Sequence, residues 1–168
     1  MHPVYSAPVE PALLAVFRAV RRKLTATPEL WDKRVHTNRP PGKPETWVRP
    51  YVVLSDSGGQ ELNTVRSTDA EVLLDVWSIA DSEEQALQMF GRVNALLNDQ
   101  GSQDINPAGA DTYLDTTISS GPLVGTSVWR VLTCTLEQYL HDIQDIEGGA
   151  KQIYLRGGRF RIRLEQVS

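Results

Sequence analysis

Residues 70–88, AEVLLDVWSIADSEEQALQ, join two patterns with hardly a break between them. In Glu71–Ile79 both alternating faces are largely apolar, which is typical of an interior strand covered on both sides. A capping box follows, with Ser82 as N-cap and Gln85 three residues later. Helical spacing then relates the apolar residues Ala86, Phe90, Val93 and Leu97. The sequence therefore predicts a strand that turns directly into a helix, Ser82–Asp99, which packs back on the same sheet.

Two side chains of this strand call for an interpretation. Trp77 is expected to be buried and to anchor the following helix, so that its truncation to alanine costs about 3–5 kcal/mol of stability. Asp75 is the exception on an otherwise apolar strand. No second acid, histidine or metal ligand stands at a telling spacing from it, so we expect a carboxylate near the sheet rim or paired with an arginine.

The rest of the sequence predicts one further helix and several strands. An amphipathic stripe from Val9 to Leu24 predicts a helix. Strands are predicted at Trp47–Leu54, Thr112–Ser119 and Ser127–Leu140, with SDSGGQ (residues 55–60) as a turn. Regular alternation in the last strand places Leu132, Cys134 and Leu136 on one face. This order of elements predicts an α+β fold, an antiparallel sheet with two helices packed on one face.

Two further segments, Thr25–Glu45 and Arg66–Ala70, are expected to be exposed loops. The first contains four prolines, and loops of this length are commonly functional. We expect both segments to be functional elements of the surface.

The C-terminal segment Lys151–Glu165 reads KQIYLRGGRFRIRLE. Gly157-Gly158 suits a two-residue type I′ turn between alternating runs, which predicts a C-terminal β-hairpin arm. The chain is thus expected to divide into a body (1–140), a linker (141–150) and the arm (151–168).

Charge divides unevenly between these parts. Residues 1–147 hold 12 Lys/Arg and 20 Asp/Glu, a net charge of −8, whereas residues 148–168 hold 5 and 1, a net charge of +4. We predict that the arm packs on an adjacent subunit with its arginines facing acidic surface. Docking on its own body has equal weight, and DNA contact comes third. The interface residues predicted on this basis are Tyr154, Arg156, Phe160, Arg161, Ile162, Arg163 and, from the loop, Arg66.

Composition and motifs argue against several classes of protein. The chain has 168 residues, a net charge of −4 and 40% hydrophobic residues, ordinary values for a soluble intracellular domain with a core. Its single cysteine excludes an intrachain disulfide. A Gly-rich phosphate loop, Cys/His metal spacing and a Gly-x-Ser-x-Gly elbow are all absent from the sequence. We therefore predict no enzyme activity, no cofactor, no metal and no membrane contact.

Several stretches together resemble a known family. These are the N-terminal amphipathic helix, RPYVVLSD (49–56), the 30 residues that begin AEVLLDVWSIADS (70–99), and VWRVLTCTLEQYL (128–140). Over about residues 9–140 they resemble the tail terminator, or tail-completion, proteins of long-tailed bacteriophages.

The resemblance implies a structural virion protein of the tail and neck, assembled in the host cytoplasm. It implies a homo-oligomeric ring, usually of six subunits, that caps the tail tube protein and joins it to the head-tail connector or stopper protein. DNA would then pass through the lumen, and the loops Thr25–Glu45 and Arg66–Ala70 would contact neighbouring subunits or line that lumen.

Two other readings remain open at this point. A nucleic-acid-binding module would use the arginine-rich C-terminal hairpin, although the sequence pI of about 5.4 is acidic where such domains are normally basic. An enzyme with a dispersed site is the third reading. A salt-dependent DNA-binding assay beside a measurement of oligomeric state discriminates the first two classes.

Overall fold

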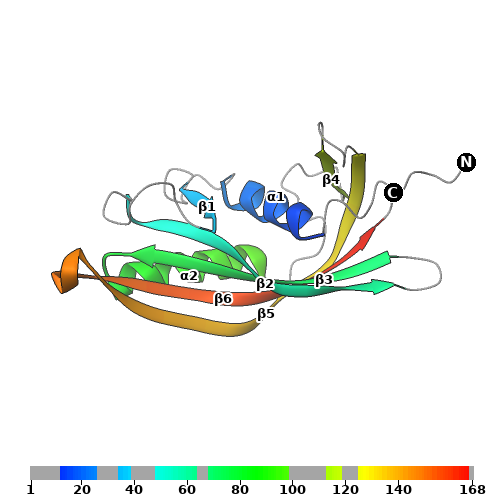
Figure 1. The fold of residues 1–168 in the computed structure, drawn as a ribbon. Coiled ribbons are helices and arrows are strands. Elements are labelled where there is room, and N and C mark those ends of the chain that lie inside the picture. Colours follow the sequence, from blue (N-terminus) through cyan, green and yellow to red (C-terminus); the bar gives the residue numbers. More distant parts are fainter. Residues whose placement is uncertain are drawn as a thin grey trace, which may run out of the picture.

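The computed structural model describes residues 12–25, 34–38, 48–63, 68–98, 113–118 and 125–166 (Figure 1). Its elements are α1 (Ala12–Thr25), β1 (Val35–Thr37), β2 (Tyr51–Asn63), β3 (Thr68–Ala80), α2 (Glu83–Leu97), β4 (Tyr113–Ile118), β5 (Gly125–Ile146), the 3₁₀ turn η3 (Glu147–Gly149) and β6 (Lys151–Gln166). The strands form one sheet in the order β1-β2-β3-β6-β5-β4. Every pairing is antiparallel except that of β1 with β2. The predicted α+β class is confirmed.

The junction between β3 and α2 follows the sequence prediction. Ser82 is the N-cap, and its hydroxyl accepts a hydrogen bond from the backbone N–H of Gln85 at 3.2 Å. The helix buries one stripe, made of Ala86, Met89, Phe90, Val93 and Leu97. Its end is capped by Asn98, whose backbone N–H donates to the carbonyl of Asn94.

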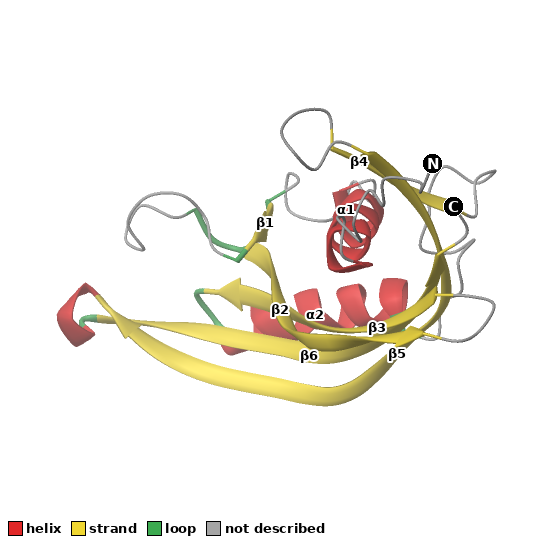
Figure 2. Ribbon diagram, turned by 45° about the vertical axis from the view of Figure 1, so that its right-hand side comes forward, coloured by secondary structure: helices red, strands yellow, loops and turns green. Residues whose placement is uncertain are grey.

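Both helices cover the same face of the sheet, as predicted. The main core joins α1 residues such as Leu24 to α2 residues such as Met89 and to the inner faces of the strands, among them Leu54, Leu74 and Ile162. The sheet curls so that α1 lies between its two ends and contacts both β1 and β4 (Figure 2). This curl gives α1 a covered side and an outer side.

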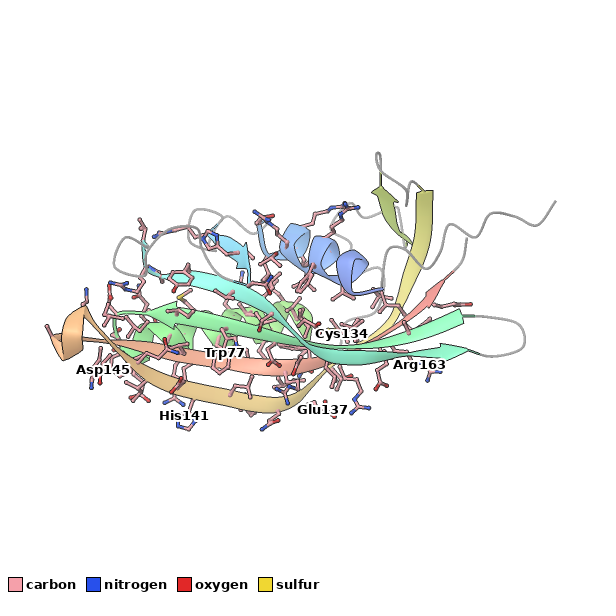
Figure 3. The ribbon with its side chains drawn as sticks, in the orientation of Figure 1. Trp77, Cys134, Glu137, His141, Asp145 and Arg163 are labelled. Carbon is pink, nitrogen blue, oxygen red and sulfur yellow. The ribbon has the colours of Figure 1, made fainter. Side chains whose placement is uncertain are left out.

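The opposite face of the sheet carries Trp77, which corrects one prediction. β3 is an interior strand, between β2 and β6, as expected. Trp77 is only partly buried, however, and packs with a second apolar cluster on the face away from the helices (Figure 3). The members of that cluster are Tyr51, Val53, Ile79, Ile153 and Leu155. The expectation that Trp77 anchors the helix is therefore wrong, because alternate residues of a strand point to opposite faces.

The polar stretch 55–60 is not the predicted turn. β2 continues through it to Asn63 and stays paired with β3. The register shifts between Asp56 and Gly58, where Gly58 has φ +117° and donates its N–H to the Asp56 carboxylate at 2.7 Å. These turn-type residues make a bulge in a long strand.

The two predicted loops are shorter than expected. β1 lies within 25–45, so that segment is not a continuous loop. β3 begins at Thr68, inside the expected loop Arg66–Ala70. The rest of both segments lies outside the described residues.

A C-terminal hairpin is present, but its turn is elsewhere. β5 and β6 pair along their length and are joined through Glu147–Gly149, whereas Gly157 and Gly158 lie within β6. The predicted turn at Gly157-Gly158 and the predicted linker 141–150 are therefore wrong. β6 also pairs with β3 from Thr68 to Ala80, so it is an internal strand of the sheet and not an arm.

Close packing, not a turn, explains the glycine pair. A Cβ on Gly157 would stand 2.4 Å from the Val76 carbonyl oxygen and 3.1 Å from the Trp77 ring. A Cβ on Gly158 would stand 2.6 Å from the Phe90 ring, on the other face. Each glycine thus admits an aromatic ring against the backbone of β6.

Two bulges change which residues of β5 face the core. The register with β6 shifts between Val131 and Thr133 and again between Leu136 and Gln138. As a result Val131 and Cys134 are buried whereas Leu132 is exposed. The expectation that Leu132 shares a face with Cys134 is wrong, because each extra residue reverses the alternation.

Replacing Gly157 with alanine should destabilise the fold by about 1–3 kcal/mol or more, because the clash is with backbone. The matched control is Gly91→Ala in α2, where a Cβ meets nothing within 4 Å and a gain of about 0.5–1 kcal/mol is expected. Urea unfolding of both variants measures the difference, and equal stabilities would contradict this packing.

The two apolar clusters should differ in their contribution to stability. Phe160 is fully buried under the helices, so Phe160→Ala should cost about 3–5 kcal/mol. Trp77→Ala should cost less, about 1–2 kcal/mol, because its ring already meets solvent. Denaturant midpoints rank the two variants, and a larger loss at Trp77 would reverse our assignment of the main core.

Candidate functional site

The predicted interface residues fall into two groups in the structure. Phe160 and Ile162 are fully buried in the chain's own core, and Tyr154 packs against that core. Phe160 and Ile162 are thus not available to a neighbouring subunit, which corrects their assignment as interface residues. The apolar face of β6 is covered by the chain's own helices. Arg66 lies outside the described residues.

The arginines of β6 face acids of the same chain. Arg159 makes a bidentate pair with Asp75, at 2.8 Å from Nε to Oδ1 and 3.1 Å from Nη2 to Oδ2. Asp75 is thus paired with an arginine, as expected. Other pairs join Arg156 to Glu83 and Arg161 to both Glu71, at 3.1 Å, and Glu137. Arg163 also has an interaction partner within the chain. The acids that these arginines meet therefore belong to the same chain: Glu71, Asp75 and Glu137 on the sheet and Glu83 at the start of α2.

These ion pairs stabilise the protonated, positively charged form of the β6 arginines. The hydrogen bond to Asp75 raises the pKa of Arg159, and the hydrogen bond to Glu137 raises the pKa of Arg161. The Asp75 side chain is 13% exposed, so its pair with Arg159 is partly shielded from water. A nucleic acid on the face away from the helices would have to compete with three carboxylates, those of Glu71, Asp75 and Glu137, which weighs against the reading as a nucleic-acid-binding module.

A further ion cluster joins three strand ends. Arg49 Nε lies 2.6 Å and Lys151 Nζ 3.3 Å from Asp81 Oδ1. Partial burial acts to raise the pKa of Asp81, but the hydrogen bond and charge of Arg49, helped by Lys151, bring that pKa below its ordinary value. The cluster connects Arg49, two residues before β2, with Asp81, the residue after β3, and Lys151 at the start of β6.

Most residues in the free stretch of β5, residues 131–146, are exposed. β4 pairs only with residues Gly125 to Arg130. Beyond that point the described residues provide no strand partner on this side of β5. Single side chains satisfy two of its N–H groups: Asn98 accepts from Leu136 and Asp142 from Ile143, both at 2.8 Å. Such an edge is a template for a partner unless it is blocked.

A groove lies between this free stretch and α2. Its cavity of about 320 Å³ is lined by residues that include Leu87, Phe90, Tyr139 and His141. The ring of Tyr139 meets that of Phe90 edge-on, with centroids 6.1 Å apart. Nevertheless, Tyr139 is 71% exposed and Ile143 51% exposed. Large exposed apolar side chains beside a groove are typical of an interaction surface.

The outer side of α1 is basic. Val16, Val20 and Leu24 are buried, whereas Arg18, Arg21 and Arg22 are exposed. α1 and the free stretch of β5 lie at opposite edges of the molecule in both ribbon views (Figures 1 and 2). Glu137, His141 and Asp145 lie along the edge remote from α1 (Figure 3).

Features of other functional classes are not seen in the described segments. In these segments no group of three or more His, Cys, Asp or Glu side chains is placed to hold a metal ion. Neither of the two helices described is both long and apolar enough to cross a membrane.

An exposed sheet edge, a groove and segregated charge are typical of proteins that contact other chains. The sequence matches the family model "Tail completion protein gp17" over residues 18–116, more than half of the chain. The chain therefore belongs to this family, which places it among the structural tail proteins of bacteriophage virions, as the resemblance implied.

The fold has a relative among solved structures. A chain of the "Virion of native gene transfer agent (GTA) particle" has a TM-score of 0.61 and 18% sequence identity, covering 93% of this chain and 98% of that chain. At this identity the likeness shows a common fold. No curated protein sequence matches the chain.

Acidification should weaken the contact between α1 and β1. Partial burial and the charge of Arg21 lower the pKa of His36 below 6.5, and its ring meets that of Tyr51 edge-on at 5.9 Å. A histidine whose pKa is lowered by folding disfavours the proton, so stability should fall as pH drops below about 6.5. The His36→Gln variant should show a smaller decrease in the urea unfolding midpoint between pH 7 and pH 5 than the wild type. An equal decrease in both proteins would contradict this prediction.

Proposed function

We propose that this chain assembles into a closed ring that ends the phage tail tube and joins it to the head connector. The ring has six subunits, as the resemblance to tail terminators implies, and DNA passes through its lumen. The partners are other copies of the chain, the tail tube protein and the connector or stopper protein. The role requires binding and no catalysis.

Membership of the tail completion family carries this proposal. The free stretch of β5 supports it, since an exposed edge with large apolar side chains suits repeated contacts between subunits. The curled sheet also forms a stiff body of long strands, which suits a load-bearing joint. By contrast, Arg156, Arg159 and Arg161 of β6 are paired with acids of the same chain, which weighs against a nucleic-acid-binding module.

Electron microscopy of the purified chain, alone and mixed with tail tubes of its own phage, tests the proposal. Rings of uniform diameter are expected, each seated on one end of a tube. In a phage that lacks this chain, filled heads and tails should accumulate separately, and supplying the chain should restore joined particles.

A control separates ring formation from general stickiness. The Gly157→Ala variant, held above its unfolding midpoint, should supply neither rings nor joined particles, whereas Val48→Ser, at an exposed position outside the groove, should supply both. Normal joining of heads to tails without the chain would overturn the proposal.

A further inference from the structure

Charges at two places on the surface have no ion-pair partner among the described residues. On α1 these are the exposed Arg18, Arg21 and Arg22, and on the free stretch of β5 they are Asp142 and Asp145. Asp142 only accepts hydrogen bonds from the neighbouring Ile143 N–H and the Gln144 side chain. The two sets have opposite sign, and the rest of the sheet pairs its arginines internally.

One member of the acidic set, Asp145, stands beside apolar side chains, whereas Asp142 belongs to the alternate positions of β5 and faces the other way. Tyr139, His141, Ile143 and Asp145 alternate along β5 and therefore share one face, the face that also borders the groove with α2. Tyr139 and Ile143 are both more than half exposed. The free stretch of β5 thus offers an aromatic and aliphatic platform that ends in a carboxylate.

Arginine fits such a platform better than other residues. Its aliphatic stem packs on apolar surface while the guanidinium stays solvated or reaches an acid. It also stacks on aromatic faces, and arginine and tyrosine are both enriched at interfaces. The outer side of α1 presents arginines at i, i+3 and i+4, which lie on one side of a helix.

The positions of the two surfaces decide the symmetry of their contact. They lie at opposite edges of one subunit (Figures 1 and 2), so they cannot meet within it. Contact between the α1 arginines of one copy and the β5 platform of the next is heterologous, head to tail. A heterologous contact generates a ring when its rotation closes.

We propose that the exposed arginines of α1 dock on the free stretch of β5 in the adjacent copy, with Tyr139 and Ile143 under the arginine stems, Asp145 as the acid on the same face and Asp142 as a second acid at the free edge of the strand. This inference rests on the proposed ring and names the surfaces that build it. The occupant of the groove between α2 and β5 is therefore a second copy of this chain.

Charge reversal on each side tests the contact. Variant A carries Asp142→Arg and Asp145→Arg, and variant B carries Arg18→Glu and Arg21→Glu. Each alone places like charges across the interface, so sedimentation velocity should show self-association weakened by about 100-fold or more. All changed residues are exposed, so the thermal midpoints should stay near that of the wild type.

Mixing the two variants is the decisive measurement. In an alternating ring the reversed platform of A meets the reversed helix of B, and the native platform of B meets the native helix of A. An equimolar mixture should therefore regain rings with A and B in equal number, which native mass spectrometry of the mixture counts. If a reversal variant fails to fold, Asp142→Asn with Asp145→Asn replaces A and should weaken association without supporting the mixed ring.

A platform variant and a matched control variant test the apolar side chains of the β5 platform. Tyr139→Ser with Ile143→Ser should weaken association by about tenfold, whereas Val48→Ser, 67% exposed outside the proposed contact, should leave it unchanged.

The outcomes separate this inference from the proposed function. Rings of A alone and of B alone, equal to those of the wild type, would overturn the inference and leave the proposed function standing. Loss of binding to double-stranded DNA in B, with rings intact, would assign the α1 arginines to the lumen and also overturn it. Failure of the wild type to form rings, alone or on tail tubes, would overturn both.

Discussion

The structure depends on the close packing of β6 between β3 and β5. At Gly157 and Gly158 this strand leaves space for the Trp77 ring on one face and the Phe90 ring on the other. The same strand contributes Phe160 and Ile162 to the core under the helices and Arg159 to the pair with Asp75. Hydrophobic burial, sheet pairing and charge compensation therefore all meet on one strand.

This arrangement explains the uneven charge of the sequence. The positive excess near the C-terminus is not spread over a surface, because β6 inserts among acidic neighbours and pairs its arginines with Glu71, Asp75, Glu83 and Glu137. With these pairs formed, the charges without an ion-pair partner among the described residues include the arginines of α1 and the aspartates of β5. A subunit that compensates its interior charges and leaves two complementary edges is suited to repeat itself around an axis.

Local patterns in the sequence predicted the fold class but not the place of β6 in the sheet or the bulges of β5. The capping box at Ser82 and the two-faced apolar pattern of β3 depend on near neighbours, so α2 and the interior strand were predictable. Gly157-Gly158 has the local chemistry of a turn, and only the aromatic rings that pack on it, from residues far away in the sequence, make it part of a strand. The exposed platform at Tyr139 was missed for a similar reason: two bulges in β5 reverse the alternation, and bulges leave no clear mark in one sequence.

The position of β6 in the sheet has a consequence for the order of folding. During synthesis β3 and β5 emerge before the strand that belongs between them, so the sheet stays divided until the last of the described elements has left the ribosome. Such non-local pairing is slow to form. A nascent chain that lacks β6 also lacks the covering of its core, and the free stretch of β5 has no support. In the proposed ring, the contact surface on β5 would therefore be complete only after β6 has paired with it, which places contact between copies after the synthesis of β6.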